Sequence, residues 1–508
     1  MKKSIFVPAC VNLAGVLVTA TSVAQTTATP STVTVNTTSR LAQLADTPIG
    51  ANAAVWDSHL YEAAIPDLLS DAGVRLVRYP GGSTADVYHW QSGTGAYAAN
   101  TFDSYMSVVR AAHAQAMITV NYGSGTPAEA AGWVQYANTG GPSYKGPVPT
   151  YPGGSATGQR YHIKYWEIGN EIYGNSTYGG NWENDVNPPG PAEYAGRLQQ
   201  YSAAMKSVDP SIKIGAVLTA PGNWPDGQTS ASSPLPWNDT VLSTACSAAD
   251  FVIVHWYPQG PTGESDQGLL AAPQSGESTS VSYTPSIPSM VDTVKSLVAQ
   301  YCGSHAKDIE ILVTETNSVS YNPGKQTTSL VNGLFLADSI VTWLENGVTN
   351  VDLWGIHNSP TCGTNDSSSL YGSYDYGDYG FLSSGGMCST SVEPPAETPF
   401  PSYYGVQMLA HAIEPRGTLL SATSSAALVS AHAVKGEAGN VNVLLVNKDP
   451  ANSYAVTVSL QGARAWGDGD VFTYGENSSS IEHSATRVSR SSFAITLAPY
   501  SLTTVRVH

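Results

Sequence analysis

Two glutamates stand directly after short apolar stretches, where a carboxyl group can be held in place to do chemistry. Glu171 ends the sequence WEIGNE at 166–171, and Glu315 lies within the sequence VTETN at 313–317. Neither has a lysine or arginine beside it in the chain, so simple ion pairing does not explain them. Hydrolysis of a glycosidic bond requires such a pair, with one carboxyl group protonated and the other ionised. We therefore interpret Glu171 and Glu315 as candidate catalytic residues.

The separation of the two carboxyl groups would decide the stereochemistry. The acid protonates the leaving oxygen, and in a retaining enzyme the carboxylate attacks the anomeric carbon. A separation of about 5–5.5 Å gives retention, whereas about 6.5–9.5 Å leaves room for a water molecule and gives inversion. Because Glu171 would face apolar groups and the charge of Glu315, we expect its pKa to be raised.

Other polar and aromatic side chains follow further apolar stretches. The candidate substrate-binding residues are Arg78, Asn121, Asn170, His255, Tyr257 and Trp354. Structural alternatives stay open for three of them: an ion pair within the fold for Arg78, a hydrogen-bonded core position for His255, and core packing for Trp354. Glu167 lies inside an apolar stretch and is interpreted as structural.

Short apolar stretches alternate with helix-like segments over most of the chain. Strands are predicted at 49–55, 74–78, 116–121, 165–169, 213–218, 251–255, 310–314 and 351–354. Helices are predicted at 66–72, 102–114, 126–136, 191–207, 286–301 and 330–346. Such alternation indicates a parallel sheet, and this number of strands favours an α/β fold of the (β/α)8 TIM-barrel type over a doubly wound sheet. Active residues of these barrels lie at the C-terminal ends of the strands. The candidate residues would then meet at one face, with Glu171 and Glu315 on opposite sides of it.

The barrel is predicted to span 46–415 and to be followed by a C-terminal β-sandwich at 416–508. In the second region, short strands are predicted at 428–434, 441–446, 454–460, 470–474, 493–497 and 502–507, without helical patterns between them. Residues 25–45 are rich in threonine and serine and are interpreted as a leader and a candidate strand of the sandwich. Loops near 140–160 and 357–400 are rich in Gly, Pro, Ser and Tyr and could line the site.

The first 24 residues have the features of a secretory signal peptide. Lys2 and Lys3 precede an apolar stretch, and small residues at 22–24 offer a cleavage site. We therefore expect a secreted protein, either extracellular or periplasmic. No other stretch approaches the roughly 18 apolar residues of a membrane-spanning helix, so no membrane association is expected.

Cysteine content fits export. Apart from Cys10 in the signal peptide, the chain has four cysteines, Cys246, Cys302, Cys362 and Cys388. An even number in an exported chain suggests two disulfides, for which three pairings are possible. The shortest loops would join the first two cysteines and the last two. Because the spacing does not match a zinc site and no other ligand cluster is evident, we expect no metal and no cofactor.

The 508-residue chain has a net charge of −17 and only 22 lysines and arginines. Nucleic acid is therefore excluded as a partner, because that binding depends on neutralising phosphates. The chain also has 28 tyrosines and 11 tryptophans among few charges. Most of these rings are expected to fill cores, and the composition also suits a protein that presents aromatic rings to a neutral or weakly charged ligand.

Four motifs together resemble clan A glycoside hydrolases. WEIGNE at 166–171 is similar to the acid/base motif of the clan, and VTETN at 313–317 is similar to its nucleophile strand. RYPGGS at 78–83 resembles the second strand of family 51 α-L-arabinofuranosidases and of heparanase-like family 79, and HWYP at 255–258 resembles the sixth strand. The resemblance runs along most of the barrel and into the terminal sandwich.

The resemblance implies roles for individual residues. Glu171 would be the acid/base and Glu315 the nucleophile. Asn170 would hydrogen-bond the sugar 2-hydroxyl, and Trp354 would form a stacking floor. At the nucleophile, Tyr257 would contact Glu315, Arg78 would pair with it, and His255 would support that end of the site.

The chain departs from family 51 at Ser83, where that family commonly has asparagine, and in its signal peptide. The leading hypothesis is a secreted retaining glycoside hydrolase that acts on plant-type polysaccharide or oligosaccharide, an α-L-arabinofuranosidase. One alternative is a β-glucuronidase or heparanase-like enzyme, which would need cations for a uronic acid. Another is a non-catalytic carbohydrate-binding protein on a barrel that has lost its activity.

Overall fold

The computed structural model describes residues 28–508, except 94–99, 232, 279–282, 363–375, 389–391 and 464–466. The predicted signal peptide at 1–24 and part of the predicted loop at 357–400 lie outside the described residues. In the part of the chain that is described, no helix is both long and apolar enough to span a membrane.

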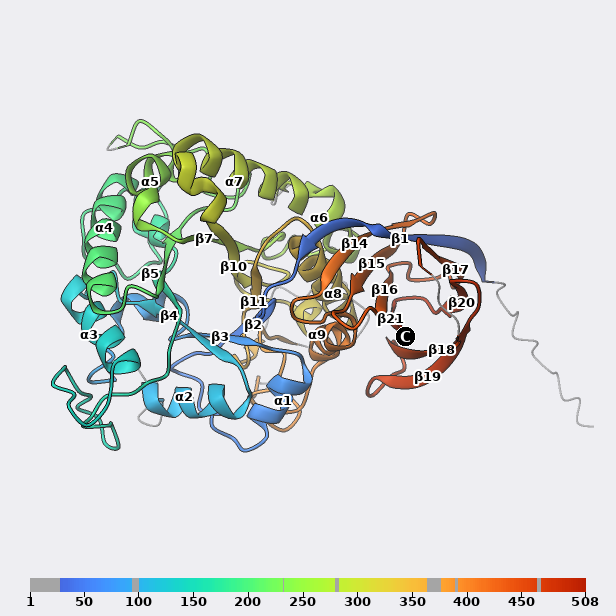
Figure 1. Ribbon diagram of the computed structural model, residues 1–508, viewed down its shortest axis with the longest axis horizontal. Coiled ribbons are helices and arrows are strands. Elements are labelled where there is room, and N and C mark those ends of the chain that lie inside the picture. Colours follow the sequence, from blue (N-terminus) through green and yellow to red (C-terminus); the bar gives the residue numbers. More distant parts are fainter. Residues whose placement is uncertain are drawn as a thin grey trace, which may run out of the picture.

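Eight parallel strands close into a barrel, which confirms the predicted fold class (Figure 1). In chain order they are β2 (Ile49–Asn52), β3 (Leu76–Tyr79), β4 (Gln115–Val120), β5 (Tyr165–Ile168), β6 (Lys213–Val217), β7 (Phe251–Trp256), β10 (Glu310–Thr316) and β11 (Asn350–Leu353). Most of their residues are buried, as expected for parallel strands that are covered on both faces. All eight coincide with predicted strands, with ends that differ by a few residues.

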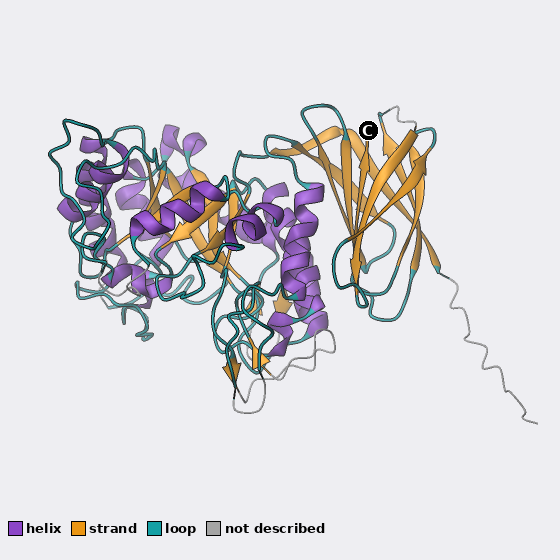
Figure 2. Cartoon of the chain, turned by 90° about the horizontal axis from the view of Figure 1, so that it is seen from below, coloured by secondary structure: helices purple, strands orange, loops and turns teal. Residues whose placement is uncertain are grey.

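Helices surround the barrel (Figure 2). They are α1 (Ile65–Asp71), α2 (Phe102–Ala111), α3 (Pro127–Asn138), α4 (Pro191–Val208), α5 (Trp237–Ala245), α6 (Asp266–Ser275), α7 (Ile287–Tyr301), α8 (Leu330–Glu345) and α9 (Pro401–Ala412). No predicted helix corresponds to α5, α6 or α9. Of these, α6 carries an internal proline, Pro273, which is unusual in a helix.

Nine strands form a second sheet with its own apolar core. They are β1 (Thr29–Gln43), β14 (Thr418–Ser424), β15 (Val429–Lys435), β16 (Val441–Asn447), β17 (Tyr454–Gln461), β18 (Gly467–Gly475), β19 (Glu482–Val488), β20 (Ser492–Leu497) and β21 (Ser501–Val507). The spatial order is β19-β18-β21-β16-β15-β14-β1-β17-β20. Because the outermost strands β19 and β20 contact each other, the sheet curls around its core.

The N-terminal strand β1 belongs to this sheet, where it pairs antiparallel with β14 and parallel with β17. Thus a strand that precedes the barrel in sequence completes the domain that follows it. Predicted strands correspond to β15, β16, β17, β18, β20 and β21, but none corresponds to β14 or β19. Most of β19 is exposed, so it lacks the apolar alternation that marks a half-buried strand.

The remaining elements are short. They are the strands β8 (Glu277–Ser278), β9 (Tyr283–Thr284), β12 (Thr361–Cys362) and β13 (Tyr376–Gly377), and the 3-10 helices η1 (Gly82–Val87), η2 (Ile172–Gly174), η3 (Cys246–Ala248), η4 (Gly303–Asp308) and η5 (Lys325–Thr328). Disulfides join Cys246 to Cys302 and Cys362 to Cys388, the pairs with the shortest loops.

Buried charges connect the barrel to the second sheet. On α8, Asp338 accepts a hydrogen bond of 2.8 Å from Nε2 of His432 and one of 3.0 Å from Nζ of Lys448. Nδ1 of His432 lies 2.9 Å from Oε1 of Glu345. Burial alone would lower the pKa of His432, but the charge of Glu345 and the bonds to both carboxylates raise it to about 10. Burial would raise the pKa of Asp338, but the charge of Lys448 and the bond from His432 hold it well below its usual range.

Candidate active site

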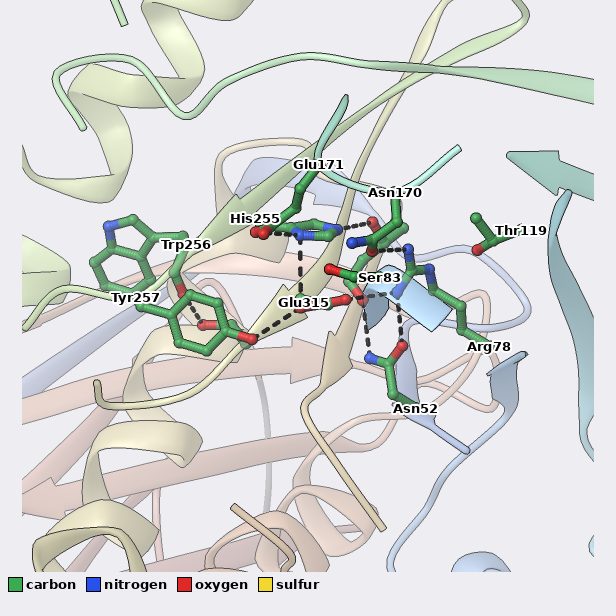
Figure 3. A network of polar contacts seen from close by, with 12 residues as sticks. Asn52, Arg78, Ser83, Thr119, Asn170, Glu171, His255, Trp256, Tyr257 and Glu315 are labelled. Atoms are coloured by element: carbon green, nitrogen blue, oxygen red, sulfur yellow. Dashed lines mark hydrogen bonds and ion pairs between the residues drawn. The ribbon is translucent and has the colours of Figure 1, made fainter. Parts of the chain in front are cut away.

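Arg78, at the end of β3, is fully buried at the centre of a polar network (Figure 3). Its Nη1 donates to Oε1 of Glu315 at 2.8 Å and to Oδ1 of Asn52 at 2.9 Å. Its Nε donates to Oε2 of Glu167 at 2.6 Å. Burial would lower the pKa of Arg78, but the charges of Glu167 and Glu315 raise it. Both interpretations of Arg78 therefore hold, because it pairs with Glu315 and also forms an ion pair within the barrel.

Glu315 has a donor on each carboxylate oxygen. Opposite Arg78, the hydroxyl of Tyr257 donates to Oε2 at 2.9 Å. The pairing of β10 with β7 shifts register between Val313 and Glu315. Side chains normally alternate between the two faces of a strand, and such an irregularity can re-aim them. Here both Thr314, which contacts His255, and its neighbour Glu315 reach the network.

Glu171 lies after β5, in a left-handed backbone conformation with φ of 32°. This region is unfavourable for residues other than glycine and occurs often at functional sites. Oε1 accepts hydrogen bonds from the Tyr173 hydroxyl at 3.2 Å and faces Nδ1 of His255 at 2.9 Å. Oε2 accepts from Nε1 of Trp182 at 2.9 Å. The Glu171 side chain is 20% exposed, against 7% for Glu315, so Glu171 is the more accessible of the two.

The prediction that the pKa of Glu171 is raised is wrong for this structure. Burial does raise it, but the hydrogen bond and charge of His255 outweigh burial, with help from Trp182 and Tyr173, so the pKa is lowered. Burial would lower the pKa of His255, but the charge of Glu315 and the contact with Glu171 raise it. The imidazole was expected to support the nucleophile end, and its shorter contact is instead with Glu171.

His255 lies between the two carboxyl groups. Its Nδ1 is 2.9 Å from Oε1 of Glu171 and 3.5 Å from Oε2 of Glu315. Its Nε2 contacts the Thr314 hydroxyl at 3.1 Å. One carboxylate oxygen of Glu171, one of Glu315 and a ring nitrogen of His255 all lie within 4.8 Å of one another. The nearest oxygens of the two carboxyl groups are thus compatible with the separation of about 5–5.5 Å between the carboxyl groups of retaining enzymes.

These three side chains also have the ligand types of a cation site, which the spacing of these residues in the sequence does not predict. A second such group in the described part of the chain is His59, Glu62 and Glu397. At the first group, donors from Arg78 and Tyr257 already occupy the oxygens of Glu315. The network is therefore satisfied by hydrogen bonds between protein groups.

Asn170 is held from three sides. Its Oδ1 accepts from Nη2 of Arg78 at 3.0 Å, its Nδ2 donates to Oε2 of Glu183 at 3.1 Å, and its backbone N–H donates to Oδ2 of Asp86 at 2.8 Å. The Ser83 hydroxyl also donates to Oε2 of Glu183, at 2.9 Å. Ser83, the departure from the family 51 pattern, thus helps to fix Asn170 through Glu183.

Asp86 and Glu183 are buried acids of the network that the pattern of strand ends does not predict. Their side chains lie within hydrogen-bonding range of each other. Burial raises the pKa of Glu183 to about 7, and burial together with the charge of Glu183 raises the pKa of Asp86 well above its usual range. Two carboxyl groups this close favour sharing one proton. Neither follows a strand of the barrel, so the rule that found Glu171 and Glu315 could not find them.

Asn121 and Trp354 occupy different positions relative to the network. Oδ1 of Asn121 accepts from the backbone N–H groups of Ser124 and Gly125, both at 2.9 Å, so this side chain caps its own turn and is not brought into the site. Trp354 is partly exposed, with its ring centroid 6.1 Å from that of Trp56. A Cβ atom on residue 82 would lie 3.1 Å from the Trp354 ring, so the RYPGGS motif leaves room for it.

No family model matches the chain. Among curated proteins, it is 28% identical over 220 residues to the probable α-L-arabinofuranosidase C of Aspergillus clavatus. The matched region covers 40% of this chain and 41% of the relative. It is 27% identical over 217 residues to the intracellular exo-α-(1→5)-L-arabinofuranosidase of Bifidobacterium longum. Here the matched region covers 40% of this chain and 35% of the relative. The chain thus matches about two fifths or less of the length of these relatives.

Solved structures match over nearly the whole chain. The α-L-arabinofuranosidase of Thermotoga maritima, in complex with arabinose, has a TM-score of 0.69 at 19% identity, covering 94% of this chain and 99% of that one. A family 44 xyloglucanase of Paenibacillus polymyxa has a TM-score of 0.66 at 14% identity, covering 94% and 100%. At such identities the likeness establishes the fold, a barrel with a C-terminal β-sandwich, which is shared by proteins named for different substrates.

Proposed function

We propose that this protein is a retaining glycoside hydrolase and that its substrate is an α-L-arabinofuranoside. The observation that carries the proposal is the cluster of Glu171, His255 and Glu315, whose facing atoms lie within 4.8 Å of one another at the C-terminal ends of barrel strands. That spacing fits double displacement. The curated relatives named as α-L-arabinofuranosidases support the choice of sugar.

In the first step, Glu315 attacks the anomeric carbon while Glu171 gives its proton to the glycosidic oxygen. The bond from the anomeric carbon to the leaving oxygen breaks, and a covalent glycosyl ester forms on Glu315. In the second step, Glu171 removes a proton from water, which attacks the same carbon and releases Glu315. Arg78 and Tyr257 hold the carboxylate of Glu315 in its orientation for the attack.

The proton for the first step belongs to the Glu171–His255 pair. In the free protein the lowered pKa of Glu171 and the raised pKa of His255 place it on the imidazole. A bound sugar that excludes water would disfavour two separated charges in the site. The proton would then move over the 2.9 Å contact from Nδ1 to Oε1, which makes Glu171 the neutral acid that the reaction needs.

The other residues are assigned to the sugar. Asn170, fixed by Arg78 and Glu183, would donate its remaining amide hydrogen to the 2-hydroxyl. Trp354 and its neighbour Trp56 would stack beneath the ring. A polysaccharide or oligosaccharide substrate is part of the same proposal. So is secretion of the protein, which the N-terminal sequence and the two disulfides support.

A β-glucuronidase activity is the second candidate, because of the resemblance to family 79. A uronic acid would need a cation for its carboxylate. Arg78, a permanent cation of the described network, is already bound to Glu167, Glu315 and Asn52. This commitment favours a neutral sugar.

A panel of aryl glycosides tests the proposal. We expect hydrolysis of 4-nitrophenyl α-L-arabinofuranoside, with an initial product of retained configuration by NMR. Cleavage of the aryl glucuronide but not the arabinofuranoside would overturn the choice of sugar. An inverted product would overturn the mechanism. Saccharide binding without cleavage of any aryl glycoside would instead indicate a non-catalytic carbohydrate-binding protein.

A further inference from the structure

We propose that Glu183 is a positioning residue of the active site, which acts with Asp86 on Asn170 so that the enzyme recognises the 2-hydroxyl group of its sugar. The inference rests on the proposed function, in which the Asn170 amide donates to that hydroxyl. Glu183 lies in the loop after β5 and is only 6% exposed. It therefore acts on the sugar through Asn170 and not by direct contact.

The two neighbours of the Asn170 amide decide which way round the amide lies. Nη2 of Arg78 can only donate and lies 3.0 Å from Oδ1 (Figure 3), whereas Oε2 of Glu183 accepts from Nδ2 at 3.1 Å. With the amide reversed, its hydrogens would face the guanidinium and its oxygen would face the Glu183 oxygen. Because Nδ2 carries two hydrogens, one remains for an acceptor on the substrate. Glu183 thus directs an amide hydrogen toward the sugar and keeps the amide from turning.

Asp86, in η1, fixes the backbone of the same asparagine. Its Oδ2 accepts from the Asn170 N–H at 2.8 Å, and its Oδ1 accepts from the backbone N–H groups of Tyr122 and Gly123 at 3.0 Å and 3.2 Å. One buried carboxyl group therefore joins the segments that follow β3, β4 and β5. Since Asp86 and Glu183 also lie within hydrogen-bonding range of each other, they hold the backbone and the amide of Asn170 as one unit.

The loop that carries Glu183 packs closely on these segments. The backbone N–H of Asn184 donates to Oε1 of Glu183 at 2.9 Å, and the Ser83 hydroxyl donates to Oε2 at 2.9 Å. The side-chain amide of Asn184 donates to the carbonyl of Ser83 at 3.1 Å. A Cβ atom on Gly123 would lie 1.9 Å from the carbonyl oxygen of Asn184, so this approach requires glycine. The carboxylate of Glu183 is therefore held at both oxygens before any sugar binds.

Glu183→Met tests the proposal, because it removes the acceptor for Asn170 and keeps a side chain of similar length. The measured quantity is the ratio of kcat/KM for benzyl α-L-arabinofuranoside to kcat/KM for its 2-deoxy analogue. The intrinsic difference between the two substrates is the same for every protein, so a change in this ratio reports the contact with the 2-hydroxyl. We expect the ratio to fall about tenfold, the scale of one hydrogen bond. Retained hydrolysis of the 2-deoxy substrate shows that the variant is folded.

The matched control is Glu277→Met. Glu277 is 5% exposed, and burial raises the pKa of both glutamates to about 7. This variant should keep the ratio of the wild type. Asn170→Ala should lower the ratio at least as far as Glu183→Met does. Adding Glu183→Met to Asn170→Ala should lower it no further, because residues that act through one contact are not additive.

Ser83→Ala is a milder variant that removes one donor to Oε2 of Glu183 and leaves both buried acids in place. It should lower the ratio about twofold to threefold, less than the loss of a whole hydrogen bond to the substrate. An unchanged ratio in Glu183→Met would overturn the proposal, as would a further fall in the double variant. If Glu183→Met hydrolysed neither substrate, an unchanged ratio in Ser83→Ala would overturn it instead. If the wild type hydrolysed neither substrate, the proposed function itself would fail, which is a distinct result.

Discussion

The Nδ1 atom of His255 lies 2.9 Å from Oε1 of Glu171, and this contact reverses the direction in which the pKa of the glutamate was expected to move. Two bases face each other across one proton. Because they interact strongly, their titration belongs to the pair and not to either residue. The pair can hold the proton on the imidazole in the free protein and deliver it from the carboxyl group during the reaction.

Replacement of His255 by asparagine should move the alkaline limb of the pH profile of kcat/KM to lower pH. In the wild type the catalytic proton is shared by Glu171 and His255, whose pKa is raised, so it is lost only at higher pH. Without the imidazole the proton is held by Glu171 alone and is lost at lower pH. The profile is to be measured with a substrate that has a poor leaving group, because its cleavage needs the acid.

The control for this variant is a substrate with a dinitrophenolate leaving group, which departs without protonation. For this substrate, the alkaline limb of the kcat/KM profile should not differ between the wild type and His255→Asn. A limb that stays in place or moves to higher pH in His255→Asn, with the poor leaving group, would mean that the imidazole does not share the catalytic proton.

Glu315→Ala should lose turnover by roughly 10⁴-fold or more, the scale on which removal of a nucleophile acts. The void would admit azide, which can attack the anomeric carbon in place of the carboxylate. With an activated aryl glycoside, azide should restore turnover and give a glycosyl azide of inverted configuration, identified by NMR. A retained glycosyl azide would assign the nucleophile to another residue.

Glu171→Ala should distinguish substrates by their leaving groups. We expect kcat/KM to fall roughly 10²–10⁴-fold for a sugar leaving group and much less for an activated phenolate, because only the former needs a proton. Azide should here give a product of retained configuration, since it would replace the water of the second step. Equal losses for both kinds of substrate would argue that Glu171 is structural.

The rule that polar residues at strand ends meet at one face predicted Arg78, Glu171, His255 and Glu315 together. It worked because the strands are buried on both faces and read as short apolar stretches. The rule failed where loops determine the contacts of a side chain. Asn121 forms hydrogen bonds within its own turn, and Glu183 and Trp182 lie in a loop with no periodic pattern. The shift in the pKa of Glu171 was predicted in the wrong direction because its contact with His255 joins residues far apart in the chain, and the local sequence does not indicate it.

Arg78→Lys should destabilise the protein although it keeps the positive charge. The guanidinium donates to Glu167, Glu315 and two asparagines in a fixed fork, which a single ammonium group cannot reproduce. We expect the free energy of unfolding to fall by about 1–3 kcal/mol, the cost of leaving a buried polar group unpaired. Arg78→Met should cost about 3–5 kcal/mol, since it leaves buried carboxylates without a cation. Urea unfolding measures both, and equal stability of Arg78→Lys and the wild type would contradict the argument.

His432 should make the stability of the whole chain depend on pH, because it links the second sheet to Asp338 and Glu345 on α8. Its pKa is raised to about 10 in the folded protein, against about 6.5 for an ordinary histidine. A raised folded pKa stabilises the protein fully below the unfolded value, and that contribution is lost as the pH rises through the folded value. The wild type should therefore lose stability between about pH 6.5 and pH 10.

His432→Asn should remove this dependence and lower the free energy of unfolding at pH 6 by about 3–5 kcal/mol, because a buried ion pair loses one partner. The matched control is His483→Asn, whose exposed pair with Asp470 should contribute about 0–1 kcal/mol. Urea unfolding at pH 6 and pH 9.5 compares the three proteins. If His432→Asn lost as much stability between these two pH values as the wild type, the charge of this imidazole would not be the source of the pH dependence. The contact of Lys448 with Asp338 and the packing of α8 against β1, β14 and β16 would then have to hold the second sheet.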